Sequence, residues 1–532
     1  MSIKTQKNLF FSLFIFYIFL FFFRLTELGL EYDEALFTNA ALNCRDPQMF
    51  LHYFKQIKGI CLPIMVMPYL GATQAYINRV VFFLFGQSIF VLRSINFYMI
   101  VASMGLITLA IKKIWSSKIA ILTVLLLAFD AQLLLVSRYD RSLSTPFLLK
   151  SVALYLFASW WRKPRWQTLF LFGLTVGFSL YSKFDFLFLV VSCLGGGFLA
   201  ILKAQGLRGS ITSVKNNLKN IIISLINLMS GFIIGTLPLI LYFAHDYQNL
   251  IKIAQAMSDT GDTVIMKLFR ITTQFSNALL FNTVFRSESF LGIISFALSA
   301  IICMFVLLAA IRAIRKSKSN YLLFGVVNSM IIFYLILIFY SGLGGWGKPH
   351  HYLLIYPLPQ IILANYLIAL KKSKKTIALF SVVFIALFFS SYIQFQYASA
   401  KTCGRKNWSC STEKVVDFVS SPDQTLVAAD WGLATQLFFY TQGKNPINEL
   451  VFLANTDRDN ELSDEIAQLA EKCALFVIPS KEEGHFDFAR DKIESRVRKL
   501  PDYYERNIYG PEDDVRLHIF QCQLTQDTLL RK

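Results

Sequence analysis

Long apolar runs recur along most of this chain, and they constrain its fold more than any other feature. Several approach or exceed the roughly 18–20 residues that a helix needs to cross a membrane. Of the 532 residues, 55% are hydrophobic and only 16% charged, whereas soluble proteins carry about 25% charge. A soluble fold would have to bury 51 Phe side chains in one very large core. The sequence therefore predicts a polytopic α-helical membrane protein.

We expect about eleven spanning helices, beginning with a run that follows Lys4 and Lys7. No small-residue cleavage site follows this run, so it is interpreted as a retained helix and not as a signal peptide. The expected spans are 8–28, 90–111, 118–136, 143–161, 166–182, 184–202, 220–243, 290–311, 320–341, 351–370 and 376–394.

Every second loop between these runs is rich in Lys and Arg, which is typical of cytoplasmic loops. The opposite loops hold most of the acidic residues and histidines. An odd number of spans and a cytoplasmic N-terminus place the C-terminus in the periplasm of a bacterial inner membrane. The net charge of +18 is thus a topology signal, and we do not expect a nucleic-acid partner.

The composition divides the chain near residue 394. Residues 1–394 are expected to form the membrane domain, with an external loop at 29–89. Stretches of this loop such as Asn39–Leu42 and Tyr76–Phe85 are amphipathic and predict helices lying at the membrane interface. Residues 395–532 alternate strand and helix patterns, which predicts a small periplasmic α/β domain. Its expected strands are 425–430, 473–479 and 515–524, and its expected helices are 433–440, 461–472 and 486–499.

The eight cysteines have no metal-ligand spacing. Three pairs could meet, either in one external loop or in neighbouring strands: Cys44 with Cys61, Cys403 with Cys410, and Cys473 with Cys522. Disulfides and free buried thiols are both compatible with the sequence.

Two adjacent carboxylates, Asp33 and Glu34, follow the first span on the external side. They could be a solvated charge pair or an acidic cap for the next helix. Alternatively, a partly desolvated carboxylate at this face could act as a general base toward a hydroxyl.

Other ionisable residues lie in or beside the third and fourth spans. Asp130 falls inside the third span, and Arg138, Asp140 and Arg141 follow at its outer end. Charges at membrane depth are costly and usually mark function or an internal pair. The arginines could reach lipid headgroups or bind a phosphate.

Two further external segments carry cations. Lys183 could pair with Asp185 or contact a phosphate. The glycine-rich segment at 342–352 contains Lys348, His350 and His351, which add donors but too few ligands to indicate zinc. All these groups lie on the external side, so we expect an external active site for a phosphorylated substrate.

Four segments, taken in order, resemble the integral-membrane glycosyltransferases of the GT-C fold. The resemblance is to the class of protein O-mannosyltransferases and lipid A aminoarabinose transferases, families 39 and 83. Asp33-Glu34 is similar to its acidic motif in the first external loop, and Ser137–Leu143 to its segment between spans three and four. Gly173–Lys183 and Lys348–Pro357 resemble two later motifs. Tyr139 and Phe184 depart from the family pattern.

The resemblance implies a hexosyl or pentosyl transfer from a polyprenyl-phosphate donor to an acceptor hydroxyl in the periplasm. Asp33 would deprotonate the acceptor, and Glu34 would orient it or hold a cation. The leaving lipid phosphate would be neutralised by Arg138, Lys183 and the segment that holds Lys348, His350 and His351, and Asp140 would belong to the same substrate-binding set. The acceptor could be a glycolipid, a polysaccharide or a protein. No cofactor is indicated, and a requirement for a divalent cation is left open.

Two other functions remain as alternatives. A lipid-linked sugar transporter or flippase would need polar residues within spans and discontinuous helices, and Asp130 and Lys150 are such residues. A polysaccharide polymerase or ligase would share the external site but would not be expected to carry the Asp33-Glu34 pair.

Overall fold

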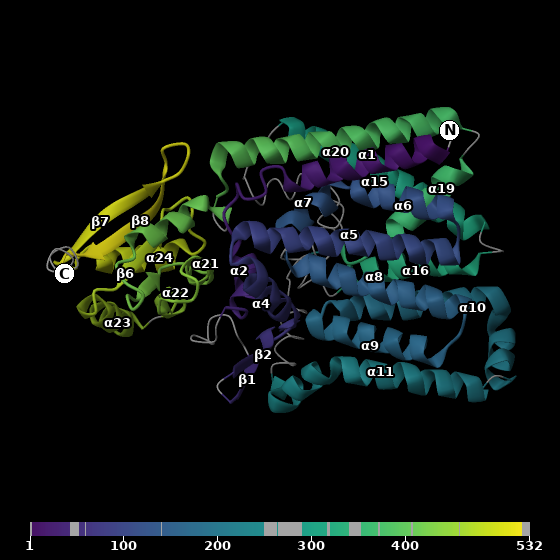
Figure 1. The fold of residues 1–532 in the computed structure, drawn as a ribbon, viewed down its shortest axis with the longest axis horizontal. Coiled ribbons are helices and arrows are strands. Elements are labelled where there is room, and N and C mark those ends of the chain that lie inside the picture. Colours follow the sequence, from purple (N-terminus) through teal and green to yellow (C-terminus); the bar gives the residue numbers. More distant parts are fainter. Residues whose placement is uncertain are drawn as a thin grey trace.

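The chain folds into a bundle of long helices with a small mixed α/β domain at one end. The computed structural model describes residues 3–42, 53–58, 60–139, 141–216, 218–248, 263, 290–316, 320–339, 353–370, 373–405, 408–456 and 458–523. The helices of the bundle run side by side, and the N-terminus lies at the end of the bundle remote from the α/β domain (Figure 1).

Each predicted span overlaps a helix or a helix pair. These are α1 (Ile3–Phe22), α5 (Ile89–Ile114), α6 (Ser117–Ala128) with α7 (Ala131–Tyr139), α8 (Arg141–Arg162), α9 (Trp166–Ser182), α10 (Phe186–Asn216), α11 (Leu218–His245), α15 (Phe290–Lys316), α16 (Tyr321–Phe339), α19 (Leu358–Ala369) and α20 (Lys374–Thr402). The predicted span 8–28 runs past the end of α1, and the predicted span 351–370 begins before α19.

Among the described residues, five helices are long and apolar enough to cross a membrane. A sixth span is added if the bent pair α6–α7 counts as one. Many side chains of α11 remain exposed on the bundle surface, including Ile226, Ile234 and Leu241, as expected where lipid replaces water. The chain is therefore a multi-pass membrane protein, and the number eleven stays a prediction.

The predicted third span is broken in the middle. α6 and α7 meet at an angle of 60°, because Asp130 interrupts the helix and caps the next one. Its Oδ1 accepts a hydrogen bond from the Leu133 N–H at 2.8 Å, and its Oδ2 accepts one from the Tyr356 hydroxyl at 2.9 Å. The ionisable residue that the sequence places within this span is thus a partly buried helix cap that also binds a second segment.

Helices α9 and α11 approach each other closely through glycines spaced four residues apart. A Cβ on Gly173 or Gly177 of α9 would lie 2.1 or 2.3 Å from a carbonyl oxygen of α11. Gly231 and Gly235 of α11 face carbonyls of α9 equally closely. Small residues at this spacing let helix backbones approach within a membrane.

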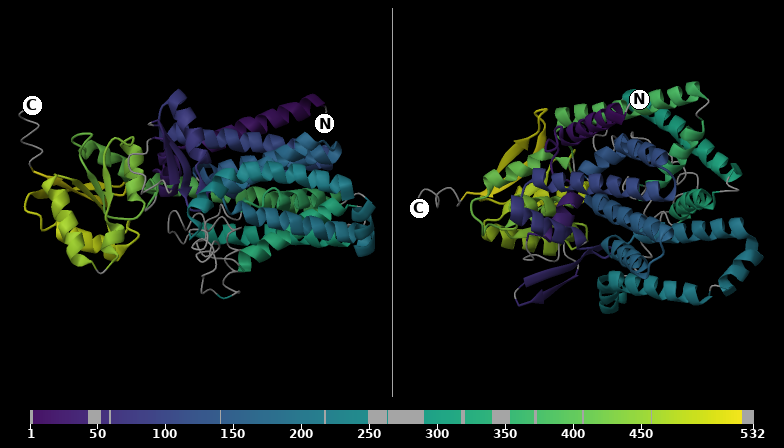
Figure 2. Two further views of the ribbon diagram at one scale, coloured as in Figure 1. Left: turned by 90° about the horizontal axis from the view of Figure 1, so that it is seen from below. Right: turned by 45° about the vertical axis from the view of Figure 1, so that its right-hand side comes forward.

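At the end of the bundle that faces the α/β domain lie α2 (Tyr32–Asn39), three short strands and α4 (Thr73–Phe85) (Figures 1 and 2). The strands β1 (Tyr53–Ile57), β2 (Ile60–Met67) and β3 (Leu70–Gly71) form an antiparallel sheet. The sequence did not predict this sheet, because its apolar strands lack a clear alternation.

The two amphipathic stretches expected in this loop have different outcomes. Tyr76–Phe85 lies within α4, whose Val80, Phe83 and Phe85 are exposed, and its position at a membrane interface stays a prediction. Asn39–Leu42 is not a helix of its own. α2 ends at Asn39, where the Ala40 N–H turns back to the Thr38 carbonyl, and residues 40–42 form a turn.

The C-terminal domain contains a five-stranded sheet in the order β5-β4-β6-β8-β7. Strands β5, β4 and β6 are parallel, whereas β8 and β7 are antiparallel. The elements are η2 (Cys410–Phe418), β4 (Leu426–Ala428), α21 (Leu433–Tyr440), β5 (Ile447–Glu449), α22 (Val451–Ala454), α23 (Asp459–Glu471), β6 (Leu475–Pro479), α24 (Asp487–Val497), β7 (Tyr503–Tyr509) and β8 (Val515–Cys522).

All six elements expected in this domain are present within a few residues of their predicted bounds. The strands β5 and β7 were not predicted. β5 has three residues, too few for an alternating pattern, and β7 is an edge strand whose exposed residues include Arg506 and Asn507.

Two of the three predicted cysteine pairs are disulfides in the described part of the chain. Cys403–Cys410 joins the end of α20 to η2, and Cys473–Cys522 joins the two central strands β6 and β8 near their ends. Cys61 is also disulfide-bonded, and Cys44 lies outside the described residues.

Candidate functional site

The Asp33-Glu34 pair lies in the first turn of α2, where a capping box fixes the helix start. Glu31 is the N-cap residue, and its carboxylate accepts hydrogen bonds from the N–H groups of Asp33 and Glu34 at 2.7 and 3.1 Å. Glu34 in turn accepts the Glu31 N–H. This arrangement satisfies donors that a helix start otherwise leaves unpaired, so it holds Asp33 in a defined place.

Glu34 and Asp33 have different surroundings. Glu34 is 1% exposed and forms a bidentate ion pair with the fully buried Arg93 of α5, at 3.1 and 2.9 Å. Arg93 also donates to the main-chain carbonyls of residues 25, 28 and 29. Asp33 is only partly buried. From its sequence, Glu34 is expected to orient an acceptor or hold a cation. An acceptor or a cation bound there would have to compete with Arg93 for the two Glu34 carboxylate oxygens.

Tyr139 brings the first two predicted motifs together. The guanidinium carbons of Arg93 and Arg138 lie 4.7 and 5.1 Å from the centre of its ring. Such cation–π contacts stabilise desolvated cations. Tyr139 departs from the family pattern of its motif, and in the structure it is the residue that contacts both arginines.

Arg138 of α7 is completely buried. Its guanidinium donates hydrogen bonds to the Leu20 and Phe23 carbonyls at the end of α1. Among the described residues, its Nε has no hydrogen-bond partner. A buried cation with an unsatisfied donor is unusual in proteins, which makes Arg138 a candidate ligand for an anion.

Lys183 ends α9 and is 2% exposed. Its Nζ lies 3.4 Å from the Asp185 carboxylate, which is equally buried. The ion pair expected from the sequence is therefore present. The neighbouring Phe184 N–H donates to the Tyr69 carbonyl at 2.9 Å, so this segment packs against the small sheet β1–β3.

Four of the predicted site residues lie outside the described residues: Asp140, Lys348, His350 and His351. The chain shortly after His351 is fixed by Lys150 of α8, whose Nζ donates a hydrogen bond to the Leu354 carbonyl at 2.8 Å. Among the described residues, no group of three or more His, Cys, Asp or Glu side chains could hold a metal ion.

The C-terminal domain contacts the segment that carries Asp33. The Gln436 side-chain amide of α21 donates to the Leu30 carbonyl at 2.5 Å, and the Leu30 N–H donates to the Tyr440 hydroxyl at 3.1 Å. At the other end of α2, the Asn39 amide donates to the Thr435 carbonyl at 2.8 Å. α21 therefore supports α2 at both of its ends.

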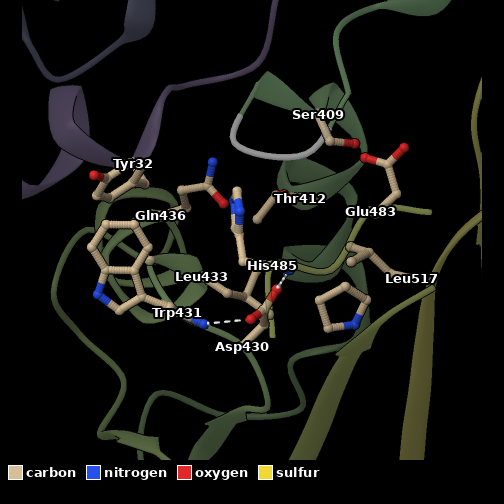
Figure 3. A pocket seen from close by; sticks show the side chains of 12 residues that line it. Tyr32, Ser409, Thr412, Asp430, Trp431, Leu433, Gln436, Glu483, His485 and Leu517 are labelled. Atoms are coloured by element: carbon tan, nitrogen blue, oxygen red, sulfur yellow. Dashed lines mark hydrogen bonds between the residues drawn. The ribbon is translucent and has the colours of Figure 1, made fainter. Parts of the chain in front are cut away.

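A shallow recess opens where α2 meets the C-terminal domain (Figure 3). Tyr32 and Trp431 form one side of it, with ring centroids 4.3 Å apart. Asp430 holds the neighbouring loops together, because its carboxylate accepts the N–H groups of Trp431, His485 and Phe486 at 2.8, 2.6 and 3.3 Å.

Glu449, the last residue of β5, contacts Gly432 of the recess. It accepts a hydrogen bond from the Gly432 N–H at 3.3 Å. Burial, assisted by the negative charge of Asp430, raises the pKa of the Glu449 carboxyl to about 7. The neutral form of this group is therefore substantially populated near neutral pH.

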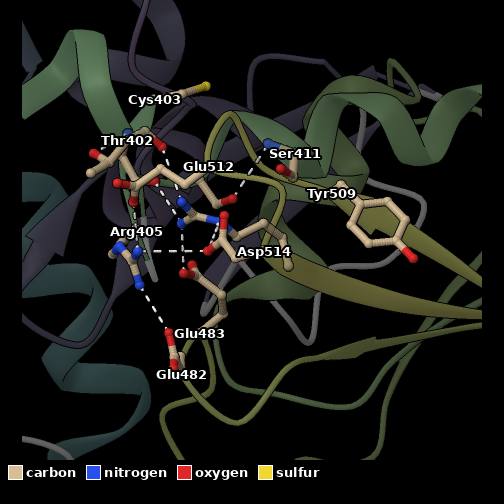
Figure 4. A network of polar contacts seen from close by, with 12 residues as sticks. Thr402, Cys403, Arg405, Ser411, Glu482, Glu483, Tyr509, Glu512 and Asp514 are labelled. Atoms are coloured by element: carbon tan, nitrogen blue, oxygen red, sulfur yellow. Dashed lines mark hydrogen bonds and ion pairs between the residues drawn. The ribbon is translucent and has the colours of Figure 1, made fainter.

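Two arginines, the buried Arg516 and the partly exposed Arg405, join the end of α20 to the domain (Figure 4). Arg516 donates to the Gly404 and Thr402 carbonyls and to Glu483, at 3.1, 3.3 and 2.7 Å. Arg405 pairs with Glu482 and Glu512 at 3.0 and 2.9 Å. These contacts fix the connection between the bundle and the domain.

Sequence reasoning missed Arg93 and the recess. Arg93 had a usable signal, because a charged residue inside a predicted span calls for an internal partner. Trp431 and His485 had none, since 54 residues separate them and only the parallel arrangement of β4 and β6 brings them together.

The family model described as dolichyl-phosphate-mannose-protein mannosyltransferase matches residues 72–232, less than a third of the chain. No curated protein sequence matches. Among solved structures, the chain is similar to ArnT from Cupriavidus metallidurans in its apo state and bound to undecaprenyl phosphate. Both matches have a TM-score of 0.59 and 11% identity, and both cover 98% of this chain.

The ArnT matches cover 99% and 98% of the apo and the lipid-bound chain, respectively. They extend over the bundle and the C-terminal domain alike. The oligosaccharyltransferase AglB from Archaeoglobus fulgidus has a TM-score of 0.49 at 12% identity, over 96% of this chain and 74% of that one. The likeness to ArnT shows that this chain has the GT-C fold.

Proposed function

We propose that this GT-C-fold membrane protein is a glycosyltransferase that moves a sugar from a polyprenyl-phosphate donor to an acceptor hydroxyl. The solved relative ArnT binds undecaprenyl phosphate, and the matching family model describes enzymes that use a lipid-phosphate mannose. The observation that carries the proposal is the placement of Asp33. It is partly exposed, on a helix fixed by Glu31, Arg93 and α21, where bundle and domain meet.

In this mechanism Asp33 takes the proton from the acceptor hydroxyl as the oxygen attacks the anomeric carbon. The bond between that carbon and the phosphate oxygen breaks, and the polyprenyl phosphate leaves with the electron pair. General acid–base assistance of this kind contributes about 10²–10⁴-fold. The phosphate leaves as an anion, so the leaving group needs no general acid.

Arg138 is our first candidate for binding the departing phosphate, because its buried guanidinium has an Nε–H with no hydrogen-bond partner in the described part of the chain. Lys183 contributes less, since Asp185 already offsets its charge. We retain Lys348, His350, His351 and Asp140 as further members of this site. Stabilising the charge that develops on the leaving group is usually the largest catalytic effect.

Glu34 positions the base in this account and does not contact the substrates. Its two oxygens bind Arg93, which connects α2 to α5 and to Tyr139. The site then faces the periplasm of a bacterial inner membrane, with the N-terminus in the cytoplasm.

One observation favours the transporter alternative. The 60° break between α6 and α7 is the kind of discontinuous helix found at transporter binding sites. The carboxylate at the break, Asp130, is occupied by the cap of α7 and by Tyr356, which gives it a structural role.

The test supplies purified protein in detergent with radiolabelled polyprenyl-phosphate sugars and a lipid extract as the source of acceptors. We expect label to move to an extractable product, with release of polyprenyl phosphate. The same donor is also tested with the protein in lipid vesicles. A flippase would move the labelled donor from one leaflet to the other without cleaving it. Translocation without cleavage of any donor would refute the enzyme assignment.

A further inference from the structure

We infer that the recess between α2 and the C-terminal domain binds a neutral or amino-bearing sugar ring of the acceptor, which makes the acceptor a glycan or glycolipid. This inference rests on the proposed glycosyl transfer and names the class of molecule that receives the sugar. It also gives the C-terminal domain a role in binding.

The recess has an aromatic side suited to a sugar. The rings of Tyr32 and Trp431 are 4.3 Å apart and inclined at 52°, and His485 stands nearly perpendicular to Trp431 at 6.1 Å. A pyranose presents one face of C–H groups, which packs against aromatic rings as other apolar surfaces do. Figure 3 shows the two rings on one side of the recess and Ser409 and Glu483 on the other.

The opposite side is polar. Glu483 is 5% exposed and is held by Arg516 at 2.7 Å, and the hydroxyl group of Thr412 and the amide group of Gln436 also line the recess. Carboxylate, amide and hydroxyl groups can accept from or donate to the hydroxyls at the edge of a sugar ring. The recess therefore combines an aromatic side with polar side chains that can fix the orientation of a bound sugar ring.

The negative charge of the recess is unfavourable for the lipid-phosphate donor. Its lining includes the carboxylates of Asp430 and Glu483, and none of the described lining residues is a lysine or an arginine. Arg516 pairs with Glu483 from outside the recess and offsets part of this charge, but its guanidinium is already engaged, so a phosphate would still meet the Asp430 carboxylate without a free cation in the lining. The lipid-phosphate donor does not fit this chemistry, whereas a neutral sugar or an amino sugar does.

The walls are fixed before any ligand arrives. Asp430 ties Trp431 and His485 together through their N–H groups. Gly432 faces Tyr32 so closely that a Cβ would lie 2.9 Å from it, and its φ of +81° favours glycine. Preorganised walls reduce the entropy lost on binding.

The recess also lies next to the proposed base. Tyr32 directly precedes Asp33 in α2, and consecutive Cα atoms are about 3.8 Å apart. His485 is exposed at the rim, so the rest of a larger acceptor can extend into solvent. Asp33 does not itself line the recess, but a sugar packed on Tyr32 and Trp431 would be bound at the residue directly before it.

Saturation-transfer-difference NMR on the full-length protein in detergent tests this site. The probes are the methyl glycosides of glucose, galactose and N-acetylglucosamine, with glucuronic acid as an anionic comparator. We expect saturation of ring C–H protons from at least one neutral glycoside, and at least threefold weaker signals from glucuronic acid. The absence of saturation for all three glycosides at 50 mM, roughly the weakest affinity worth calling a subsite, would overturn the inference.

Four variants locate the binding. Trp431→Ala should reduce the signal about fivefold or more, and Trp431→Phe should keep most of it. His485→Ala should weaken the signal, and its exposed position makes a folding defect improbable. Phe488→Ala is the matched control, because Phe488 is an exposed aromatic of the same domain that does not line the recess. An equal signal in Trp431→Ala and wild type, or equal losses in Phe488→Ala and Trp431→Ala, would refute the assignment.

The same samples separate this inference from the proposed function. Asp33→Asn should bind the glycoside as wild type does while losing transfer. Binding that depends on Trp431 in a protein without transferase activity would contradict only the proposed function. Transfer that is insensitive to Trp431 and His485 would contradict only the inference.

Discussion

At the scale of single residues, the structure assigns different environments to two adjacent carboxylates. Glu34 is enclosed and matched by Arg93, whereas Asp33 is partly exposed beside it. A carboxylate in a bidentate ion pair is a poor base, because its neighbour stabilises the ionised form. The sequence predicted Asp33 as the base and Glu34 as a residue that orients the acceptor or holds a cation; we propose instead that Glu34 positions α2, while Asp33 stays the candidate base.

Removing one partner of the Arg93–Glu34 pair should destabilise the protein more than removing both. Arg93→Met leaves a buried carboxylate without its partner, which typically costs about 3–5 kcal/mol. The double variant Arg93→Met/Glu34→Met removes both charges and should recover part of the loss. Thermal unfolding in detergent measures this difference. A double variant less stable than Arg93→Met would contradict the pairing.

The raised pKa of Glu449 predicts that the stability of the C-terminal domain depends on pH. Its pKa of about 7 in the folded protein exceeds the ordinary value of 4.5, so folding binds a proton between these pH values. Its contribution to stability is complete below about pH 4.5 and is lost as the pH rises through 7, by roughly 2–3 kcal/mol. Urea unfolding of wild type and Glu449→Gln, followed by domain tryptophan fluorescence, should show a flatter pH profile for the variant. Identical profiles would refute this contribution.

At the scale of helices and strands, the apolar runs predicted where the helices of the bundle lie, because the length and composition of a run suffice for that. The four-residue spacing of glycines in α9 and in α11 is visible in the sequence, but the sequence does not show that these two helices pack against each other. Pairing depends on which faces meet in three dimensions, and carbonyls of one helix facing glycines of the other are visible only there. The sheet β1–β3 was missed for a similar reason: its strands are stabilised by contacts with α4 and α9 and not by a local pattern.

Gly177→Ala should loosen the α9–α11 pair. The added Cβ would lie 2.3 Å from the Phe232 carbonyl oxygen, so the helices must move apart, at a cost of roughly 1–3 kcal/mol. Gly197→Ala in α10 is the control, since a Cβ there meets nothing within 4 Å. Unfolding temperatures of the two variants check this prediction. Equal temperatures would show that the close approach is not stabilising.

At the scale of the whole molecule, the bundle and the C-terminal domain meet where we propose the site. The Arg405 and Arg516 contacts fix the domain to α20, and Gln436 and Thr435 fix it to α2. The sequence predicted both parts and their order. It could not predict their docking, because the contacts join residues about 400 positions apart.

The predicted topology places Lys371 in the cytoplasm and Lys532 in the periplasm. A phosphatase reporter, active only in the periplasm, should be inactive when fused after Lys371 and active after Lys532. The N-terminus lies at the far end of the bundle from the C-terminal domain (Figure 1), which agrees with this orientation. Equal activity of both fusions would overturn the sidedness of the proposed site.

The central claim is that Asp33 is the base of a glycosyl transfer. The most direct measurement compares kcat for transfer from a polyprenyl-phosphate sugar in wild type and Asp33→Asn, with unfolding temperatures as the control. We predict a loss of about 10²–10⁴-fold in kcat with little change in stability, because Asp33 is only partly buried. Transfer by Asp33→Asn at the wild-type rate would contradict the assignment.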